Sequence, residues 1–326
     1  MTPALRQRLS ELLPDSRVRF DVPLRPLTTL RIGGPADALV ELGSEADVLA
    51  LFAWLEREGL PVFVLGKGSN LLVADAGVRG VVVRLGRGLD GFNAASAAEP
   101  DGTRLVTAGA ALANGMFVSR CEALGLGGME FLIAVPGSIG GAIAMNAGAH
   151  QGETADFLDS VRIYEGGAGI HDVPAHKLRF AYRHSALRGQ DGRLVLAGRF
   201  QLRPAEPAAI RAQVASFQTY RRNTQPRDFP NCGSVFKNPP GDFAARLIEA
   251  AGLKGHHHGA AQVSEKHANF IVNRGGATAA DVLGLIDLVR ARVAAEYGIT
   301  LELELQQLRP HDMPHGANAT AAAATP

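Results

Sequence analysis

The sequence predicts an α+β protein of more than one domain, and three observations lead to this prediction. The chain has 326 residues, which exceeds the roughly 100 to 200 residues of a typical domain. A strand, helix, strand pattern comes first, glycine-punctuated strands follow, and amphipathic helices alternate with short strands near the C-terminus. We therefore expect an N-terminal helix and first unit over residues 1–85, a second unit over 86–203 and an α+β domain over 204–309.

The composition excludes several classes of protein. Lys plus Arg number 33 and Asp plus Glu number 32, and this balance lacks the basic surface typical of proteins that bind nucleic acid or anionic membranes. Cys121 and Cys232 lie far apart, without a CxxC spacing or a nearby His, which argues against a disulfide framework or structural zinc. We expect a monomeric protein of the reducing cytoplasm.

The two ends of the chain predict no targeting or membrane segment. Acidic residues interrupt the apolar ones within residues 1–20, unlike the apolar core of a signal peptide. No apolar stretch reaches the length that spans a bilayer, so membrane insertion is not expected. Residues 310–326 are polar and alanine-rich without a periodic apolar face, which predicts a disordered tail.

The first unit should contain a helix between short strands. Ser44 is a suitable N-cap, the apolar residues after it recur at helical spacing, and Gly59 ends the pattern. Strands are expected before and after this helix, over residues 37–42, 62–65, 71–73 and 81–85.

Two glycine-rich segments are candidate ligand sites. GKGSN, residues 66–70, matches neither the GxGxxG pattern nor the P-loop, so it is either a hairpin turn or a nest of backbone N–H groups that binds an anion. Residues 127–153 are close to half glycine and alanine. They form either the wall of a cofactor site, where bare backbone approaches a ligand, or a tightly packed turn or lid.

The second unit should be rich in strands, expected over residues 103–112, 160–166 and 193–202. A helix over residues 113–126 interrupts them. Its apolar residues at helical spacing are Met116, Phe117, Cys121 and Leu124.

The third region should contain helices over residues 208–226, 242–252 and from Thr278 onward. In the middle helix we expect Phe243, Leu247 and Ile248 to point inward and Gly252 to follow the last turn. Thr278 is the predicted N-cap of the last helix, with Asp281 completing a capping box. The predicted buried stripe of that helix is Val282, Leu285, Ile286, Val289 and Val293.

Four polar residues and one histidine tract are candidates for chemistry. Arg183 is either a surface residue or a fixed cation for an anionic ligand, and Ser234 is either a turn residue or a positioned proton donor. LELEL, residues 301–305, should be a strand with Glu302 and Glu304 on one face, at least one of them solvated. Residues 256–258 are consecutive histidines, which cannot readily converge on one metal ion.

These segments together resemble a known family. GKGSNLLV, VPGSIGGAIAMNAGAHQGE, YRHS, GSVFKNP, LIEAAGLKG, VSEKHANFIVN and GITLELEL are similar, in this order, to segments of UDP-N-acetylenolpyruvoylglucosamine reductases, also called UDP-N-acetylmuramate dehydrogenases. The resemblance covers the chain from about Thr28 to Leu308. The short spacing between YRHS and RRNTQP resembles the second type of this family.

The resemblance implies a fold and a cofactor. The fold is a two-subdomain FAD-binding fold of the vanillyl alcohol oxidase type, also called the PCMH type, followed by a C-terminal α+β substrate domain. The implied FAD contacts are Gly66, Lys67, Gly68, Ser69, Asn70, Pro136, Gly137, Ser138, Gly140, Gly141, Asn146 and Gly148.

The resemblance also implies a reaction in peptidoglycan precursor synthesis. NADPH reduces the flavin, and hydride then passes from flavin N5 to the enolpyruvyl group of UDP-N-acetylglucosamine enolpyruvate. Arg183 would stabilise the resulting enolate, Glu304 would act with it at the substrate carboxylate, and Ser234 would donate the proton. The implied substrate contacts are Tyr182, Arg222, Lys237, Asn238 and Lys254.

Two other function classes are compatible with the glycine-rich segments. One is a flavoprotein oxidase or dehydrogenase of the same cofactor fold that acts on an alcohol or sugar. Such an enzyme would lack the GSVFKNP and VSEKHANFIVN segments. The other is a nucleotide-binding module without catalytic activity, which would leave the dispersed Arg183, Ser234 and Glu304 without a shared role.

Overall fold

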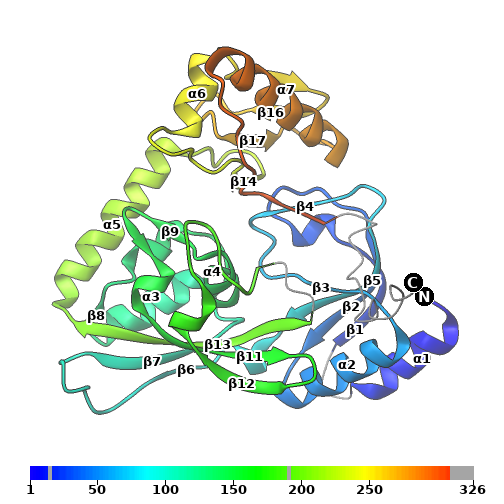
Figure 1. Ribbon diagram of the computed structural model, residues 1–326, viewed down its shortest axis with the longest axis vertical. Coiled ribbons are helices and arrows are strands. Elements are labelled where there is room, and N and C mark those ends of the chain that lie inside the picture. The colour runs from blue at the N-terminus through cyan, green and yellow to red at the C-terminus, as the bar shows by residue number, and fades with distance from the viewer. Residues whose placement is uncertain (14–16, 189–191, 309–326) are drawn as a thin grey trace, which may run out of the picture.

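The structure is a computed structural model that describes residues 1–13, 17–188 and 192–308. The chain folds into an N-terminal unit, a central unit and a C-terminal domain, which Figure 1 shows at the right, at the lower left and at the top. The predicted tail over residues 310–326 lies outside the described residues. None of the helices in the described part is both long and apolar enough to cross a membrane.

The N-terminal unit is a small sheet with strand order β1-β2-β5-β3, covered by two helices. Its elements are α1 (Pro3–Leu12), β1 (Arg17–Pro23), β2 (Pro35–Leu42), α2 (Glu45–Glu58), β3 (Val62–Val64), β4 (Leu71–Val73) and β5 (Val78–Leu85). The prediction for α2 is confirmed, because Ser44 Oγ accepts the N–H of Asp47 in a capping box and Gly59 ends the helix at φ +62°. Val48, Leu51 and the adjacent apolar residues of α2 pack against the sheet.

The central unit is built on an antiparallel sheet with strand order β12-β11-β13-β7-β6, and β8 pairs with the end of β13. Its elements are β6 (Phe92–Ala94), β7 (Arg104–Gly109), α3 (Asn114–Ala123), β8 (Leu126–Gly127), α4 (Ile139–Met145), β9 (Gly148–Ala149), β10 (Gly152–Glu153), β11 (Leu158–Glu165), β12 (Gly169–Pro174) and β13 (Arg193–Pro204). Short 3-10 helices connect the elements of both units, namely Arg25–Leu27, Arg87–Leu89, Glu130–Ala134, Thr154–Phe157 and Ala175–Leu178.

The prediction for α3 was partly wrong. Phe117 and Cys121 are buried as expected, but Met116 and Leu124 are exposed. The helix ends at Ala123 and Leu124 is its C-cap, so the helical spacing no longer decides where the Leu124 side chain points.

A long helix, α5 (Pro207–Thr224), runs along one edge of the molecule between the central unit and the C-terminal domain (Figure 1). It packs against α3 and the 3-10 helix Glu130–Ala134 of the central unit. The sequence placed α5 in the C-terminal domain, over residues 204–309. In the structure α5 packs on the central unit.

The C-terminal domain is a sheet with strand order β14-β17-β16-β15 and two helices. Its elements are β14 (Asn231–Ser234), α6 (Ala244–Ala250), β15 (His257–His258), β16 (Ala261–Val263), β17 (Phe270–Asn273) and α7 (Ala279–Tyr297). The capping box of Thr278 and Asp281 and the predicted buried stripe of α7 are confirmed.

In α6, Leu247 and Ile248 are buried and Gly252 follows the helix at φ +71°, as predicted. Phe243, however, is 66% exposed, so its predicted inward position was wrong. Phe243 is the N-cap and has extended backbone angles, and therefore it lies outside the helical period.

The predicted strand over residues 301–305 was also wrong, because only Leu303 forms an isolated bridge there, with Phe236. The strand begins just afterwards as β18 (Gln306–Leu308) and pairs in parallel with β4 of the N-terminal unit. Figure 1 shows the chain returning from the C-terminal domain to the N-terminal unit along this path. The return segment, residues 301–308, therefore ties the two ends of the fold together.

Candidate active site

The GKGSN loop and the segment after it face a second glycine-rich loop. Ser69 Oγ donates a hydrogen bond to the carbonyl of Pro136 at 2.7 Å, which joins the two loops. Gly68 has φ +63°, and a Cβ there would lie 2.3 Å from the carbonyl oxygen of Leu27, so only glycine fits. Because β3 and β4 belong to different sheets, the loop between them is not a hairpin turn.

Within the described part of the chain, no hydrogen bond is donated by the backbone N–H groups of residues 66–70. Consecutive free N–H groups in one turn form an anion-binding concavity. This loop therefore has the donors that a pyrophosphate needs, and the sequence alone could not distinguish this nest from a simple turn.

The second loop, over residues 136–141, leads into the short helix α4, which the sequence did not predict. Gly140 lets α4 approach β7 and the turn after it closely, since a Cβ there would lie 2.8 Å from Cβ of Ala110. Ser138 has the extended N-cap conformation, yet its side chain makes no capping bond. Its Oγ faces Gly66, where an added Cβ would lie 3.5 Å away.

Asn146 and Gly148 follow α4 and hold a neighbouring loop. Asn146 is buried at φ +44° and its Nδ2 donates to the carbonyl of Ala181 at 3.1 Å. Arg183 Nη2 donates to the carbonyl of Gly148 at 2.8 Å. Both of these predicted flavin contacts thus also position the loop that carries Arg183.

Arg183 is a fixed cation in the structure. Its Nε donates to Oε1 of Glu304 at 3.0 Å, and both side chains are largely buried, at 18% and 17% exposure. The guanidinium also lies over the ring of Tyr182, 4.9 Å from its centroid. Arg183 adopts φ +54°, a conformation that is uncommon outside glycine and frequent at functional sites.

Glu304 and Glu302 are separated by the structure, although the sequence placed them on one face of a strand. Glu302 is exposed and pairs with Lys237 at 3.3 Å. Burial raises the pKa of Glu304, while the neighbouring Arg183 and Arg188 act in the opposite direction. The Glu304 carboxyl group is therefore easier to protonate than a carboxyl in water.

Ser234 lies beside Glu304 at the end of β14. The carbonyl of the next residue, Val235, accepts the N–H of Glu304 at 2.9 Å and of Leu305 at 3.2 Å. The Ser234 hydroxyl makes no hydrogen bond to any described residue and is half-buried. The structure thus brings Arg183, Ser234 and Glu304 together from the central unit, the C-terminal domain and the return segment.

Cys232, two residues before Ser234, is buried and free. Burial raises the pKa of its thiol to about 12, and Glu304 adds to the rise. This thiol is therefore a protonated packing group.

Arg222 lies in a basic pocket of about 270 Å³ that also includes Arg221, Arg227, Gln218 and Ile133. Burial lowers the pKa of Arg221, and the charge of Arg227 contributes. The sequence reasoning missed Arg221 and Arg227, although three arginines in a short run before Ser234 are visible in it.

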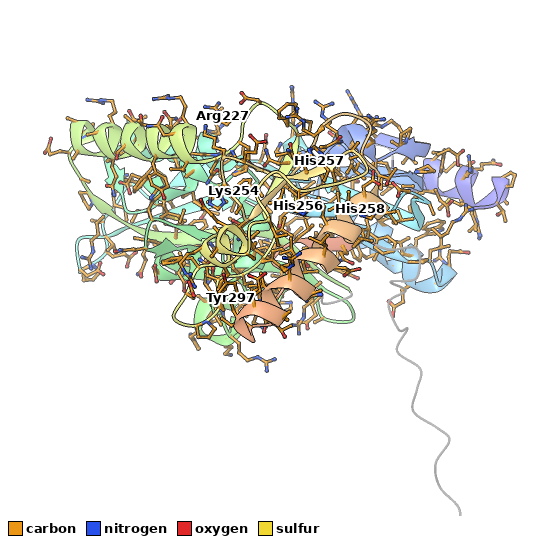
Figure 2. The ribbon with its side chains drawn as sticks, turned by 90° about the horizontal axis from the view of Figure 1, so that it is seen from above. Arg227, Lys254, His256, His257, His258 and Tyr297 are labelled. Atoms are coloured by element: carbon orange, nitrogen blue, oxygen red, sulfur yellow. The ribbon has the colours of Figure 1, made fainter. Side chains whose placement is uncertain are left out.

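The other predicted substrate contacts lie in different places. Asn238 caps α6, since its Oδ1 accepts the N–H of Ala244 at 3.1 Å, and its own N–H donates to the Tyr182 hydroxyl at 3.4 Å. Lys254 pairs with Glu249 at 2.7 Å and lies on the C-terminal domain (Figure 2). Tyr182 and Asn238 thus meet across the two folded parts, whereas Lys254 is engaged locally.

The three consecutive histidines lie around β15, as Figure 2 shows for His256, His257 and His258. His258 packs over Gly284 of α7, where an added Cβ would lie 2.6 Å from its Nε2. Among the described residues, no group of His, Cys, Asp and Glu could hold a metal ion. His257 and His258 form β15, and His258 packs on α7.

Known proteins match the chain in two segments. A family model described as "FAD binding domain" matches residues 36–173. A second, described as "UDP-N-acetylenolpyruvoylglucosamine reductase, C-terminal domain", matches residues 225–308. The second match argues against an alcohol or sugar oxidase, in which this domain is not expected.

Individual relatives are similar over nearly the whole chain. The chain is 44% identical over 303 residues to UDP-N-acetylenolpyruvoylglucosamine reductase 2 of Symbiobacterium thermophilum, over 93% of this chain and 96% of that protein. It is 48% identical over 288 residues to a reductase of the same name from Anaeromyxobacter dehalogenans, over 88% of this chain and 84% of that protein. The crystal structure of a UDP-N-acetylenolpyruvylglucosamine reductase from Thermus caldophilus superposes with a TM-score of 0.73 at 36% identity, over 90% of this chain and 99% of that one.

These similarities confirm the predicted fold class, a two-subdomain FAD-binding fold with a C-terminal domain. The first matched segment contains both glycine-rich loops, and the second contains Ser234 and the return segment.

Proposed function

The chain belongs to the UDP-N-acetylenolpyruvoylglucosamine reductase family, and from this premise we propose how its residues perform the reaction. The enzyme is an FAD-dependent oxidoreductase that reduces UDP-N-acetylglucosamine enolpyruvate to UDP-N-acetylmuramate for peptidoglycan synthesis. We propose NADPH as the electron donor. The observation that carries the mechanism is the buried pair of Arg183 and Glu304, which the backbone contact of Glu304 with Val235 places next to Ser234.

The two glycine loops are proposed to hold FAD. The free N–H groups of residues 66–70 suit its pyrophosphate, and Lys67 adds a positive charge without an acidic partner in the described chain. The link between Ser69 and Pro136 keeps the loops at a fixed separation. When bound, FAD supplies the hydride that reaches the terminal carbon of the substrate alkene.

Arg183 is proposed to stabilise the negative charge that develops on the substrate enolate. Its guanidinium is held on two sides, by Glu304 and by the carbonyl of Gly148, so it needs little rearrangement when the charge appears. Such preorganised donors contribute roughly 10²- to 10³-fold to a rate.

Glu304 is proposed to meet the substrate carboxylate in its protonated form. An ionised carboxylate there would repel the substrate, and burial of Glu304 already raises its pKa. The guanidinium of Arg183 then bridges the enzyme carboxyl and the substrate carboxylate.

Ser234 is proposed to donate the proton that completes the reduction. Its hydroxyl has no partner among the described residues, so its proton is free to move to the substrate carbanion. A serine hydroxyl is a weak acid, and it serves here because the enolate carbon is a strong base beside the positive Arg183.

The UDP phosphates are proposed to bind the pocket of Arg221, Arg222 and Arg227, because three guanidinium groups line it. Tyr182 and Asn238, which touch each other, would close the substrate site, while Lys237 and Lys254 would have to exchange their carboxylate partners for the ligand.

The proposed location is the bacterial cytoplasm, which agrees with two buried and unpaired cysteines. We propose that the enzyme acts as a monomer of the second type within its family, as the short spacing after YRHS indicates.

The test is a two-step stopped-flow assay on purified, FAD-loaded protein. NADPH bleaches the flavin without oxygen, and UDP-N-acetylglucosamine enolpyruvate is then added to follow the return of the yellow colour. We expect Ser234→Ala to slow the second step by roughly 10²- to 10⁴-fold and to leave bleaching unchanged. Exposed Ser119→Ala is the matched control. Reoxidation of Ser234→Ala at the wild-type rate would remove the proposed role of this serine.

A further inference from the structure

A second basic pocket is lined by residues other than those proposed for the reaction. It has a volume of about 430 Å³ and is lined by Arg25, Pro26, Arg31, Phe229, Pro230, Asn273, Arg274, Gly275 and Gly276. This volume is within the range of small-molecule sites, about 300 to 1,000 Å³. None of these residues is a proposed contact of the flavin or the UDP-sugar.

The charges in this pocket are not compensated. The lining includes Arg25, Arg31 and Arg274 but no acidic residue. Within the part of the chain that the structure describes, these three guanidinium groups make no ion pair. Arg274 is fixed by its position over the ring of Phe229, 4.0 Å from the centroid. Like charges around one concavity repel each other unless an anion lies between them.

Arg31 adds an independent observation, because its backbone is held at φ +58°. This left-handed conformation favours glycine and is unfavourable for a residue with a side chain. The turn is fixed by the hydrogen bond from the Arg31 N–H to the carbonyl of Thr28, at 3.2 Å. An arginine kept at an unfavourable backbone angle, with its side chain on a pocket, indicates a use for that side chain.

We propose that this pocket, named the Arg274 pocket after its best-fixed cation, binds a small polyvalent phosphate anion. A planar guanidinium offers paired N–H donors that match the oxygens of a phosphate. Three such groups around one pocket match a diphosphate better than a singly charged anion.

The Arg274 pocket also lies where two parts of the fold are joined. Thr29 Oγ1 donates to the carbonyl of Asn231 at 2.7 Å, and Asn273 Nδ2 donates to the carbonyl of Leu30 at 3.0 Å. An anion held by Arg31 and Arg274 would therefore bridge the N-terminal unit and the C-terminal domain. Its binding is expected to raise the melting temperature of the protein.

The experiment is isothermal titration of the FAD-loaded full chain with inorganic pyrophosphate. The wild type is expected to bind at two places, the pocket of Arg222 and the Arg274 pocket. Arg222→Gln should keep the second site, and adding Arg274→Gln or Arg31→Gln should weaken it about tenfold or more. Arg222→Gln with Arg292→Gln is the control, since Arg292 lies on α7 and pairs with Glu296.

Two results would overturn the proposal. One is an Arg222→Gln protein that binds no pyrophosphate, and the other is equal affinity in the Arg274→Gln and Arg292→Gln backgrounds. Arg274→Gln in the otherwise native chain provides a second measurement, because this variant should bind one equivalent of pyrophosphate fewer than the wild type. Arg31→Gly should keep or raise the melting temperature without pyrophosphate and lose part of the rise that pyrophosphate produces.

Discussion

Nε of Arg183 lies 3.0 Å from Oε1 of Glu304, although 121 residues separate the two in the chain. Arg183 belongs to a loop of the central unit, and Glu304 belongs to the return segment that leads to β18. The pair therefore forms only when the C-terminal part of the chain has docked on the rest. The geometry proposed for catalysis and the completion of the fold depend on the same contact.

Glu304→Gln should change how stability depends on pH. Burial raises the pKa of Glu304 in the folded protein, so the folded state holds this proton more tightly than the unfolded state. The stabilisation is present at low pH and is lost as pH rises from about 4.3, the ordinary value, through the raised one. Glutamine does not titrate, so the variant does not lose stability in this way. The difference in melting temperature, variant minus wild type, should therefore increase with pH.

The measurement is thermal denaturation from about pH 4, near the ordinary pKa of a glutamate carboxyl, to about pH 8. Glu302→Gln is the matched control, because the Glu302 side chain is 75% exposed and its difference from wild type should stay nearly constant. A constant difference for Glu304→Gln as well would show that the Glu304 pKa is not raised in the folded protein.

Asn70→Ala should disturb Glu304 through the backbone of the return segment. Asn70 Nδ2 donates to the carbonyl of Glu304 at 3.1 Å, and the carbonyl of Asn70 accepts the N–H of Gln306 at 3.1 Å. Losing the side-chain bond should cost about 1 kcal/mol of stability and slow flavin reoxidation by the substrate. Bleaching by NADPH should change less, because the flavin loop keeps its backbone donors.

Absorbance spectra and the two stopped-flow steps measure these effects separately. Asn70→Asp keeps the size of the side chain but replaces the amide donor with a carboxylate oxygen. It should slow flavin reoxidation at least as much as Asn70→Ala. A variant that loses FAD but reoxidises normally when reloaded would assign Asn70 to the flavin alone.

Local sequence signals at the helix ends correctly predicted α2 and α7. Ser44 and Gly59 bound α2, and Thr278 with Asp281 starts α7, because each residue acts within its own turn. The proposed catalytic roles of Arg183, Ser234 and Glu304 came from the family resemblance. No local pattern connects Arg183 to Glu304, since their contact depends on the docking of the return segment.

Two of the failures have a common physical origin in long-range contacts. α4 was missed because a run of glycine and alanine has little helical amphipathicity, and close packing on Ala110 stabilises it instead. LELEL alternates like a strand, but its neighbours in space allow only the bridge between Leu303 and Phe236. Tertiary packing decided both segments.

His150→Ala should loosen the loop around Arg183. His150 lies at the tip between β9 and β10, at φ +52°, and stacks on Phe217 of α5 with ring centroids 4.0 Å apart. The same hairpin supplies the Gly148 carbonyl that binds Arg183. Without the stacked ring, we expect kcat to fall several-fold, with a smaller change in stability, because Arg183 loses a fixed partner.

His150→Phe is the informative companion variant, since it keeps an aromatic ring on Phe217 and should restore most of kcat. Burial lowers the pKa of His150, so its neutral form is the one that stacks. Stability from His150 should therefore be present above about pH 6.5, its ordinary pKa, and be lost as pH falls through the lowered value. Equal kcat in the alanine and phenylalanine variants would exclude a role for the stacked ring.

Asp75→Ala should weaken the connection between the N-terminal unit and the C-terminal domain. Asp75 accepts the N–H of Ala279 at 2.8 Å and of Ala280 at 3.2 Å, so it caps α7 from another part of the fold. α7 also has its own cap, in which Thr278 Oγ1 accepts the N–H of Asp281 at 3.1 Å. Each cap should contribute about 1 kcal/mol, but only Asp75 ties two folded parts together.

The effects of the two caps can therefore be distinguished by the cooperativity of unfolding. Trp54 is the one tryptophan of the sequence and is buried in α2, so its fluorescence reports the N-terminal unit, whereas far-ultraviolet circular dichroism reports the whole chain. In Asp75→Ala, we expect the two unfolding transitions to separate. Thr278→Ala should lower both midpoints together, because it weakens α7 without removing the contact between the parts. Coincident transitions in Asp75→Ala would mean that β18 and the Thr29 contact suffice to keep unfolding cooperative.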